Sequence, residues 1–244
     1  VHRFVEYARL VAARIGDRVV AITTHNEPWV VAVLGHESGI FAPGLRHRGI
    51  AMQVAHHLML SHGLALQALR ADGCKARLGI VLNLSPIGPA TESPDDVAAA
   101  RLEDGRSVRW YMDPLFKGSY PIDVWEHLGG DVPQVLDGDM AAIHTPMDFL
   151  GINYYTRGVV SASGAWSAQT SGKRLTDMGW EIVPEGLTEL LVRLHRDWTL
   201  PALYVKENGA AFRDAVVETS ESRRVNDIDR TDYIASHIAA VGDA

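Results

Sequence analysis

The sequence predicts an α/β fold with a parallel β-sheet of the kind that builds a (β/α)8 barrel. Two observations predict it: continuous apolar runs, typical of strands buried on both faces, and helical stretches between those runs. The first run, Val19 to Pro28, reads VVAITTHNEP, and the last, Ala202 to Gly209, reads ALYVKENG. Because such alternation implies right-handed βαβ units, we expect the polar ends of both runs at one edge of the sheet.

The first half of the chain is predicted to contain two helices and two strands. Apolar residues at helical spacing predict a helix from Arg3 to Ile15, before the Val19 strand. A long loop is expected from Trp29 to Gly49. It leads to a mostly apolar helix, Ile50 to Ala71, and then to a second buried strand, Arg77 to Leu84.

The second half is predicted to contain two more strands and two more helices after an irregular segment. Ser85 to Pro146 departs from simple alternation, and we expect an elaborated connection, not a separate domain. The third strand is expected from Asp148 to Thr156 and the fourth from Ala202 to Glu207. An amphipathic helix is predicted from Pro184 to Trp198 and a last helix from Asn226 to Val241. The pattern thus contains four of a barrel's eight strands.

The composition is that of an ordinary globular protein and argues against two classes of partner. With 23 Lys and Arg against 30 Asp and Glu the formal net charge is −7, and no long basic run is present, so we expect no nucleic-acid partner. No apolar stretch reaches the roughly 18 to 20 residues of a membrane span, so we expect no membrane insertion. The single cysteine, Cys74, excludes an internal disulfide framework and fits a reducing compartment.

Three histidines on the second predicted helix, His56, His57 and His62, do not indicate a metal site. Their spacing does not place them on one ligand face, and no carboxylate lies at the usual spacing. We therefore expect no metal.

Two glutamates follow apolar runs in the same manner, and together they indicate catalysis. A Glu at a strand end is more often a surface or capping residue, so Glu27 alone would carry little weight. Glu207 repeats the arrangement after a distant run. Two carboxylates on different strands of one parallel sheet can face each other, because the strand ends converge on one pocket.

Three motifs stand out, and weaker ones lie between them in order. The three are Asn26-Glu27-Pro28, the segment FLGINYY from Phe149 to Tyr155, and Glu207-Asn208-Gly209. The weaker ones are Ala42-Pro43-Gly44, Asp113-Pro114, Lys117-Gly118-Ser119-Tyr120-Pro121, Asp177-Met178-Gly179-Trp180 and Pro184-Glu185-Gly186-Leu187. This series covers nearly all 244 residues, and through it the sequence resembles glycoside hydrolase family 1, the β-glucosidase type.

The resemblance implies a partial (β/α)8 TIM barrel. The four predicted strands would be the fourth through seventh of eight, with the third and seventh helices beside them. Residues 1–244 would form a single incomplete catalytic domain that lacks the first three strands and the last one. The family and the single cysteine imply a cytoplasmic location, and the sequence carries no signal for an oligomeric state.

The resemblance also implies a retaining β-glycosidase that hydrolyses small-molecule β-D-glycosides without a metal or organic cofactor. Glu27 would be the general acid/base and Glu207 the nucleophile, with carboxyl groups about 5 to 5.5 Å apart in an intact site. Asn26 would hydrogen-bond the sugar 2-hydroxyl. Tyr155 would donate to Glu207, and Asn153 would support the same subsite. For Asn153 and Tyr155 the alternative is that they only cap a strand end.

The sequence departs from the family pattern in three ways. His25 stands where the family commonly has Phe, and Lys206 stands where Thr usually precedes the nucleophile. Because strand side chains alternate, we expect Lys206 to point away from Glu207, towards the helix layer. Most residues that grip the sugar in the family have no counterpart here. We therefore expect this chain alone to be inactive, as an open half-barrel with two exposed sheet edges.

Two alternatives belong to other functional classes. A non-catalytic sugar-binding protein, or a degenerate half-barrel descended from the enzyme, would not need both Glu27 and Glu207. A different barrel enzyme, such as an aldolase or isomerase, would need a buried strand lysine or a phosphate-binding loop rich in glycine. Lys206 is the candidate for that lysine, and the Glu207-Asn208-Gly209 motif that follows it disfavours this alternative.

Overall fold

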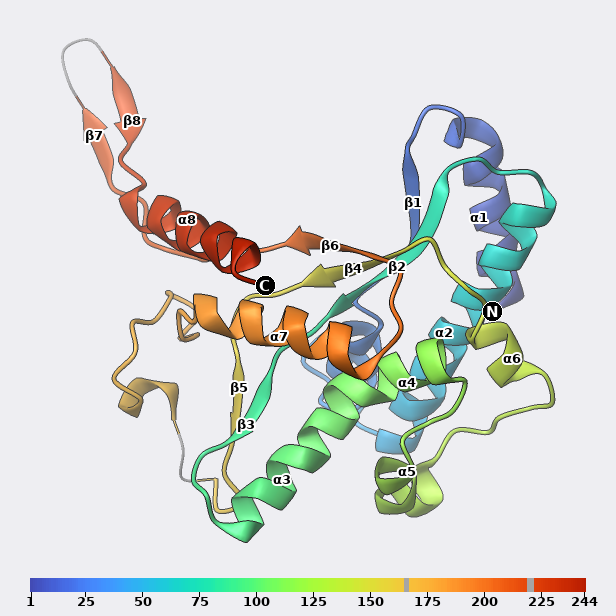
Figure 1. Cartoon of the computed structure of the whole chain (residues 1–244), viewed down its shortest axis with the longest axis horizontal. Coiled ribbons are helices and arrows are strands. Elements are labelled where there is room, and N and C mark those ends of the chain that lie inside the picture. Colours follow the sequence, from blue (N-terminus) through green and yellow to red (C-terminus); the bar gives the residue numbers. More distant parts are fainter. Residues whose placement is uncertain (165–166, 219–221) are drawn as a thin grey trace. The chain divides into compact units, whose positions relative to one another are not determined.

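The computed structural model describes residues 1–164, 167–218 and 222–244, and in them the chain forms two compact units (Figure 1). The first unit consists of Val1–Leu84, Asp104–Asn153 and Trp198–Lys206. The second unit consists of Ser85–Glu103, Tyr154–Asp197 and Glu207–Ala244. Within the described ranges, every helix is too short or too polar to cross a membrane.

The first unit is built on an open four-stranded sheet. Its strands, in spatial order, are β1 (Ala21–Asn26), β2 (Arg77–Asn83), β4 (Phe149–Asn153) and β6 (Ala202–Glu207, whose last residue belongs to the second unit). β1 pairs with β2, and β2 with β4, in parallel, and the arrow of β6 points the same way as that of β4 in Figure 1. All four predicted strands are thus confirmed. In the described part of the chain β1 and β6 each have one neighbour in this sheet, so the barrel is not closed.

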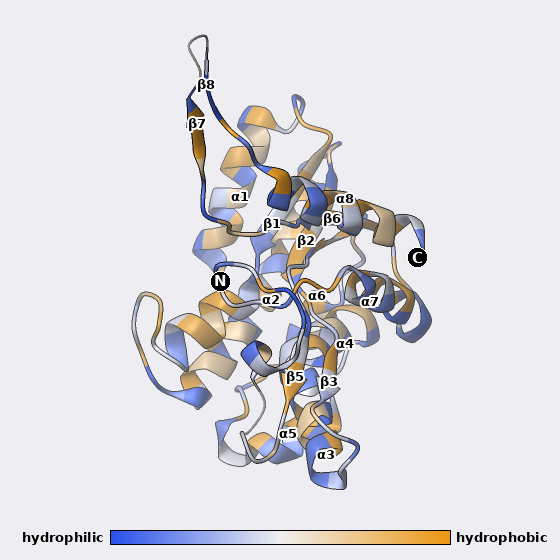
Figure 2. Ribbon diagram, turned by 90° about the vertical axis from the view of Figure 1, so that its left-hand side faces the viewer, coloured by the Kyte–Doolittle hydropathy of each residue, from blue (hydrophilic) through white to orange (hydrophobic). Residues whose placement is uncertain are grey.

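Helices pack against this sheet. α1 (His2–Ile15) packs on α2 (Arg48–Ala71), and α2 contacts both β1 and β2. The helices show hydrophobic and hydrophilic residues side by side in Figure 2, as amphipathic helices do. Side chains on both faces of β2 and β4 are almost completely buried, among them Leu78, Ile80, Val81, Phe149 and Ile152. These residues belong to the core of the first unit.

The close approach of α2 to α6 (Asp139–Ile143) depends on a glycine. A Cβ atom at Gly63 would lie 1.8 Å from the carbonyl oxygen of Ala142, so only glycine fits at this position of α2. The irregular segment contains several further short helices. It holds η2 (Gly105–Arg109), α4 (Trp110–Lys117), α5 (Ile122–Leu128) and η3 (Gly129–Asp131).

The prediction of a loop from Trp29 to Gly49 is partly wrong. Its start contains a short π-helix, η1 (Val30–Leu34), which contacts α2. The segment reads VVAVL, and Ala32 is completely buried. Contact with α2, which buries Ala32 completely, outweighs the β preference of its branched residues.

In its described residues the second unit contains three α-helices and two small sheets. The helices are α3 (Pro94–Asp104, whose last residue belongs to the first unit), α7 (Pro184–Asp197) and α8 (Ile228–Gly242), and η4 (Ala168–Thr170) is a single 3-10 turn. α7 packs on α8, and both were predicted from the sequence. The parallel pair is β3 (Ile87–Pro89) with β5 (Gly158–Val160), and the antiparallel pair is β7 (Val216–Glu218) with β8 (Arg223–Val225). Strands of three residues are too short for a periodic signal, so the sequence did not predict them.

Candidate active site

A β-bulge near the end of β1 changes the direction of its last side chains. Thr23 pairs with Gly79 of β2, but the next pair along the two strands joins Asn26 to Val81. Three steps along β1 therefore match two steps along β2, so one extra residue is inserted into β1. A bulge of this kind often lies next to an active site, where it redirects a side chain.

The two residues of the bulge both point towards α2. The Oγ1 atom of Thr24 lies 2.7 Å from Nδ1 of His62, and Nε2 of His25 lies 2.8 Å from Oγ of Ser61. The imidazole of His25 also stacks on Phe4 of α1, with 4.1 Å between ring centroids. Consecutive side chains of a regular strand point to opposite faces. The bulge breaks this rule and leaves the following residue, Asn26, on the other face of the sheet.

Both histidines behind β1 are held neutral. Burial lowers the pKa of His25 to about 4. Burial, followed by the charges of His25 and Arg70, lowers the pKa of His62 to about 3. His25 thus occupies the helix side of the sheet as a neutral ring, and its difference from the family's Phe does not change the face that carries Asn26.

Asn153 brings two of the predicted site residues together. It ends β4, is 1% exposed, and its Nδ2 atom donates to Oε1 of Glu27 at 2.7 Å and to Oδ1 of Asn26 at 3.1 Å. Its own Oδ1 atom is buried and has no hydrogen-bond partner among the described residues. A buried amide with a free acceptor can take a hydroxyl group of a ligand.

Glu27 has an unusual backbone conformation. Its φ is +52°, and among the described residues it is the only one other than glycine with a positive φ. Its amide nevertheless donates to the carbonyl of Val81 at 2.9 Å, so the pairing with β2 continues past the bulge. Left-handed backbone in a residue with a side chain is strained, and such strain is concentrated at functional sites.

Glu207 and Tyr155, both in the second unit, are joined by a short hydrogen bond. The phenolic OH of Tyr155 donates to Oε2 of Glu207 at 2.5 Å, and its ring contacts that of Trp180 with 5.6 Å between centroids. The Glu207 side chain is exposed. The next residue, Asn208, donates from Nδ2 to the carbonyl oxygen of Tyr154 at 2.9 Å. This bond fixes the chain directly after the carboxylate.

The expected direction of Lys206 is wrong. A Cβ atom built on Gly151 would lie 2.8 Å from Cγ of Lys206 and 2.6 Å from Cγ2 of Val81, so the lysine stem occupies the space above this glycine. Gly151 and Asn153 share a face because they are two residues apart on β4. Lys206 therefore lies on the face that carries Asn153, not on the helix side. It fits there because Gly151 has no side chain.

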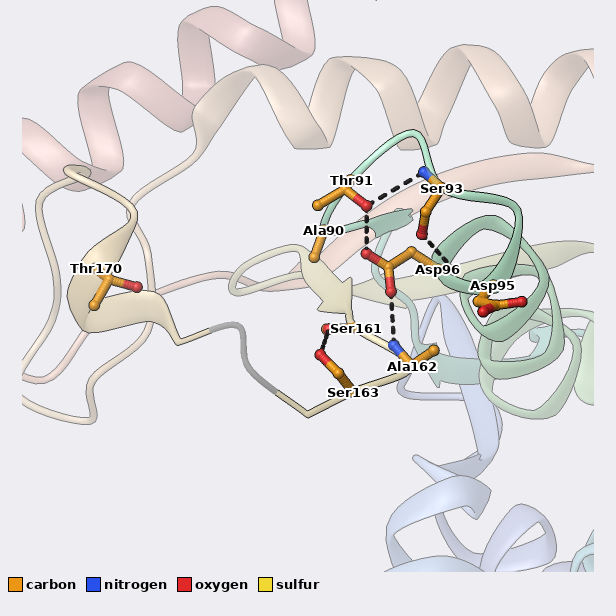
Figure 3. Close-up of a pocket in the computed structure, with 9 residues that line it drawn as sticks. All are labelled: Ala90, Thr91, Ser93, Asp95, Asp96, Ser161, Ala162, Ser163 and Thr170. Carbon is orange, nitrogen blue, oxygen red and sulfur yellow. Dashed lines mark hydrogen bonds between the residues drawn. The ribbon is translucent and has the colours of Figure 1, made fainter.

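A separate pocket of about 500 Å³ lies in the second unit and contains none of the predicted site residues (Figure 3). It is lined mainly by hydroxyl groups and carboxylates at the start of α3 and after β5. Asp96 is one of its lining residues: its carboxylate accepts from Oγ1 of Thr91 at 2.6 Å and from the amide of Ala162 at 2.8 Å, and these bonds lower its pKa. The bonds tie the start of α3 to the segment after β5.

No metal centre is formed in the part of the chain that the structure describes. There, no group of three or more His, Cys, Asp or Glu side chains is placed to hold a metal ion. His56, one of the three histidines on α2, is instead fully buried between two partners. Its Nδ1 lies 2.9 Å from the Tyr120 OH and its Nε2 lies 3.0 Å from Oδ2 of Asp139.

Comparison with known proteins extends over the whole chain. The family model Glycosyl hydrolase family 1 matches residues 1–244. Beta-glucosidase A of Acetivibrio thermocellus is 38% identical over 245 residues, which cover 96% of this chain and 54% of that protein. Beta-glucosidase A of Thermotoga maritima is 37% identical over 240 residues, which cover 96% of this chain and 53% of that protein. The chain thus spans about half the length of these curated relatives.

Solved structures show the same relationship. The crystal structure of a beta-glucosidase from Exiguobacterium marinum matches with a TM-score of 0.90 and 39% identity, covering 98% of this chain and 56% of that one. The psychrophilic beta-glucosidase from Micrococcus antarcticus matches with a TM-score of 0.92 and 37% identity, covering 99% and 56%. The open sheet is accordingly part of a (β/α)8 TIM barrel, as the sequence predicted. The chain belongs to glycosyl hydrolase family 1.

Proposed function

We propose that this chain carries the two catalytic carboxylates of a retaining β-glycosidase, which hydrolyses the O-glycosidic bonds of small-molecule β-D-glycosides. Glu27 is the general acid/base and Glu207 the nucleophile. The observation that carries the proposal is the amide of Asn153, which holds the Glu27 carboxyl and the Asn26 side chain together at the end of β1. The hydrogen bond from Tyr155 to Glu207 supports the second role.

The reaction proceeds in two displacements. In the first, an oxygen of Glu207 forms a bond to the anomeric carbon while the bond to the leaving oxygen breaks, and Glu27 gives its proton to that oxygen. In the second, Glu27 takes a proton from water, the water oxygen forms a bond to the anomeric carbon, and the bond to Glu207 breaks. Each carboxyl group returns to its starting state, so the reaction requires no cofactor.

The neighbouring residues have supporting roles. Asn26 binds the sugar 2-hydroxyl, an interaction that strengthens as positive charge develops on the ring. Tyr155 keeps the Glu207 carboxylate aligned by donating a hydrogen bond to it. Asn153 supports the same subsite, and its buried free oxygen can accept a hydrogen bond from a sugar hydroxyl.

The 244-residue chain by itself is proposed to be inactive, as one incomplete catalytic domain of a longer barrel. β1 and β6 form the two open edges of the described sheet. Tyr7 and Leu10 of α1, and Val20 directly before β1, are each more than half exposed. Open edges and exposed apolar side chains are covered in a closed barrel. We also place the protein in the cytoplasm, since its single cysteine fits a reducing compartment.

A chimera tests the function. Residues 1–244 replace the matching segment of the Thermotoga maritima relative, and hydrolysis of an aryl β-glucoside is measured for the chimera and for the chain alone. We expect activity in the chimera and none in the chain. Glu207→Gln should abolish turnover, and Glu27→Gln should slow substrates with poor leaving groups by about 10²- to 10⁴-fold. The exposed Glu126→Gln serves as the matched control.

The outcomes separate the proposal from its alternatives. A folded chimera without activity would overturn the glycosidase role. A second outcome would favour a sugar-binding protein. In that case the unmutated chimera binds sugar without hydrolysing it, and Glu207→Gln leaves the binding unchanged. Normal turnover by the isolated chain would overturn the proposed inactivity alone.

A further inference from the structure

We infer that Ser61 and His62 of α2 are positioning residues for Glu27 and Asn26, and that they act through the bulge of β1. This inference rests on the proposed function of Glu27. Neither residue is on the face of the sheet that carries Asn26. Both lie behind β1, where Ser61 is 3% exposed and His62 is completely buried.

The hydrogen bonds at Ser61 fix the direction of each proton. Its hydroxyl donates to the carbonyl oxygen of Leu58 at 2.9 Å and has no second hydrogen to give. The 2.8 Å contact with His25 must therefore be a bond in which Nε2–H of the imidazole donates to Oγ of Ser61. His25 is thus held as one neutral tautomer, and Ser61 provides the acceptor that a ring at this position requires.

His62 restrains the neighbouring residue of the bulge. Its Nδ1 atom lies 2.7 Å from Oγ1 of Thr24, and its Nε2 atom is buried without a hydrogen-bond partner among the described residues. Thr24 is thus the polar partner that the structure gives to this ring. Loss of the hydroxyl would leave a completely buried imidazole with both nitrogens unpaired, which is costly.

The bulge depends on these two contacts. In a regular strand either Thr24 or His25 would face away from α2, and a shift by one residue would turn Asn26 towards the helices. His62 holds Thr24, and Ser61 holds His25. The extra residue therefore stays at this position of β1, and Asn26 stays on the opposite face. There Asn26 and Glu27 meet the amide of Asn153.

The experiment follows the Asn153 side-chain amide by NMR in the chain itself, without substrate. Its two amide protons are hydrogen-bonded to the side chains of Asn26 and Glu27. Their chemical shifts and their exchange rates with solvent therefore report the geometry of the site. We expect Thr24→Val and Ser61→Ala to accelerate this exchange by about tenfold or more. The matched control is Ser236→Ala on α8, because the Ser236 hydroxyl makes the same bond to the carbonyl three residues earlier. It should leave both signals unchanged.

A rescue variant separates positioning from general loss of stability. In Ser61→Ala with His25→Phe, the ring at position 25 needs no acceptor, so the Asn153 signals should return towards those of the parent. Thr24→Val keeps the shape of the side chain, and unchanged exchange in the folded Thr24→Val variant would overturn the inference. The chimera assay can fail while these signals respond as expected, so failure of the proposed function is distinguishable from failure of the positioning role.

Discussion

The side-chain amide of Asn153 donates a hydrogen bond of 2.7 Å to the carboxyl group of Glu27, although the two residues are 126 positions apart in the sequence. β2 lies between the strands that carry the two residues, so the bond passes in front of the end of a strand that belongs to neither. The side chain of Asn153 is 1% exposed, which limits its freedom to turn away. The carboxyl group of Glu27 is thus oriented by a rigid strand end and not by its own loop.

Replacing Asn153 by Ala should therefore weaken catalysis more than folding. The variant loses two donated hydrogen bonds, and we expect kcat/KM of the chimera to fall by about 30-fold, which corresponds to about 2 kcal/mol. The exposed Asn226→Ala is the control. A kcat/KM equal to that of the parent would show that Asn153 merely caps β4.

Tyr155→Phe removes one hydroxyl group from the second carboxylate. The bond to Oε2 of Glu207 is short, and its loss leaves the nucleophile less well aligned. We expect kcat of the chimera to fall about tenfold with a smaller change in KM, because a charge-assisted hydrogen bond contributes about 1.5 to 3 kcal/mol at most. Tyr7→Phe, at a tyrosine that is 63% exposed, is the control. A change confined to KM would contradict the assignment.

The four strands were predictable as continuous apolar runs, α2 as a long and mostly apolar stretch, and α1, α7 and α8 from apolar residues at helical spacing. The candidate site residues were found by motif. The bulge was not predicted, because alternation assumes a regular strand and the run TTHN gives no sign that Thr24 and His25 share a face. The contacts that Ser61 and His62 make with β1 could not be predicted for the same reason, because they depend on a partner strand.

Lys206 illustrates the same limit. Alternation relative to Glu207 placed its side chain on the helix side, but the space above Gly151 admits its stem on the opposite face. A glycine two strand positions before Asn153 is visible in the sequence. Which neighbouring side chain fills the gap depends on the stagger between β4 and β6, and no local pattern encodes that.

Gly151→Ala should destabilise the chain. The new Cβ atom would lie 2.6 Å from Cγ2 of Val81 and 2.8 Å from Cγ of Lys206, and only the lysine can move away easily. We expect a loss of about 1 to 3 kcal/mol in the free energy of unfolding by urea. Adding Lys206→Ala should recover part of it. Gly88→Ala is the control, since a Cβ there meets no atom within 4 Å. Equal stability of the Gly151 and Gly88 variants would contradict the contact.

The two neutral histidines behind β1 should make the chain less stable in mild acid. In the unfolded chain both would titrate near 6.5, the ordinary pKa of histidine, whereas burial lowers the pKa to about 4 for His25 and to about 3 for His62. Below pH 6.5 the unfolded state therefore binds protons that the folded state does not. Stability is complete above pH 6.5 and falls as the pH decreases, by up to about 1.4 kcal/mol per pH unit for each histidine, until the folded-state pKa is reached.

Urea unfolding at pH 7, 6 and 5 measures this dependence. His25→Phe removes one of the two titrating rings, so the fall in unfolding free energy between pH 7 and pH 5 should be smaller than in the parent chain. The exposed His2→Phe, which loses a histidine outside this cluster, is the control. Below about pH 4 protonation of His25 itself places a charge between Phe4 and Ser61. Identical slopes for the parent and His25→Phe would show that this ring gains its proton as readily in the folded chain as in the unfolded one.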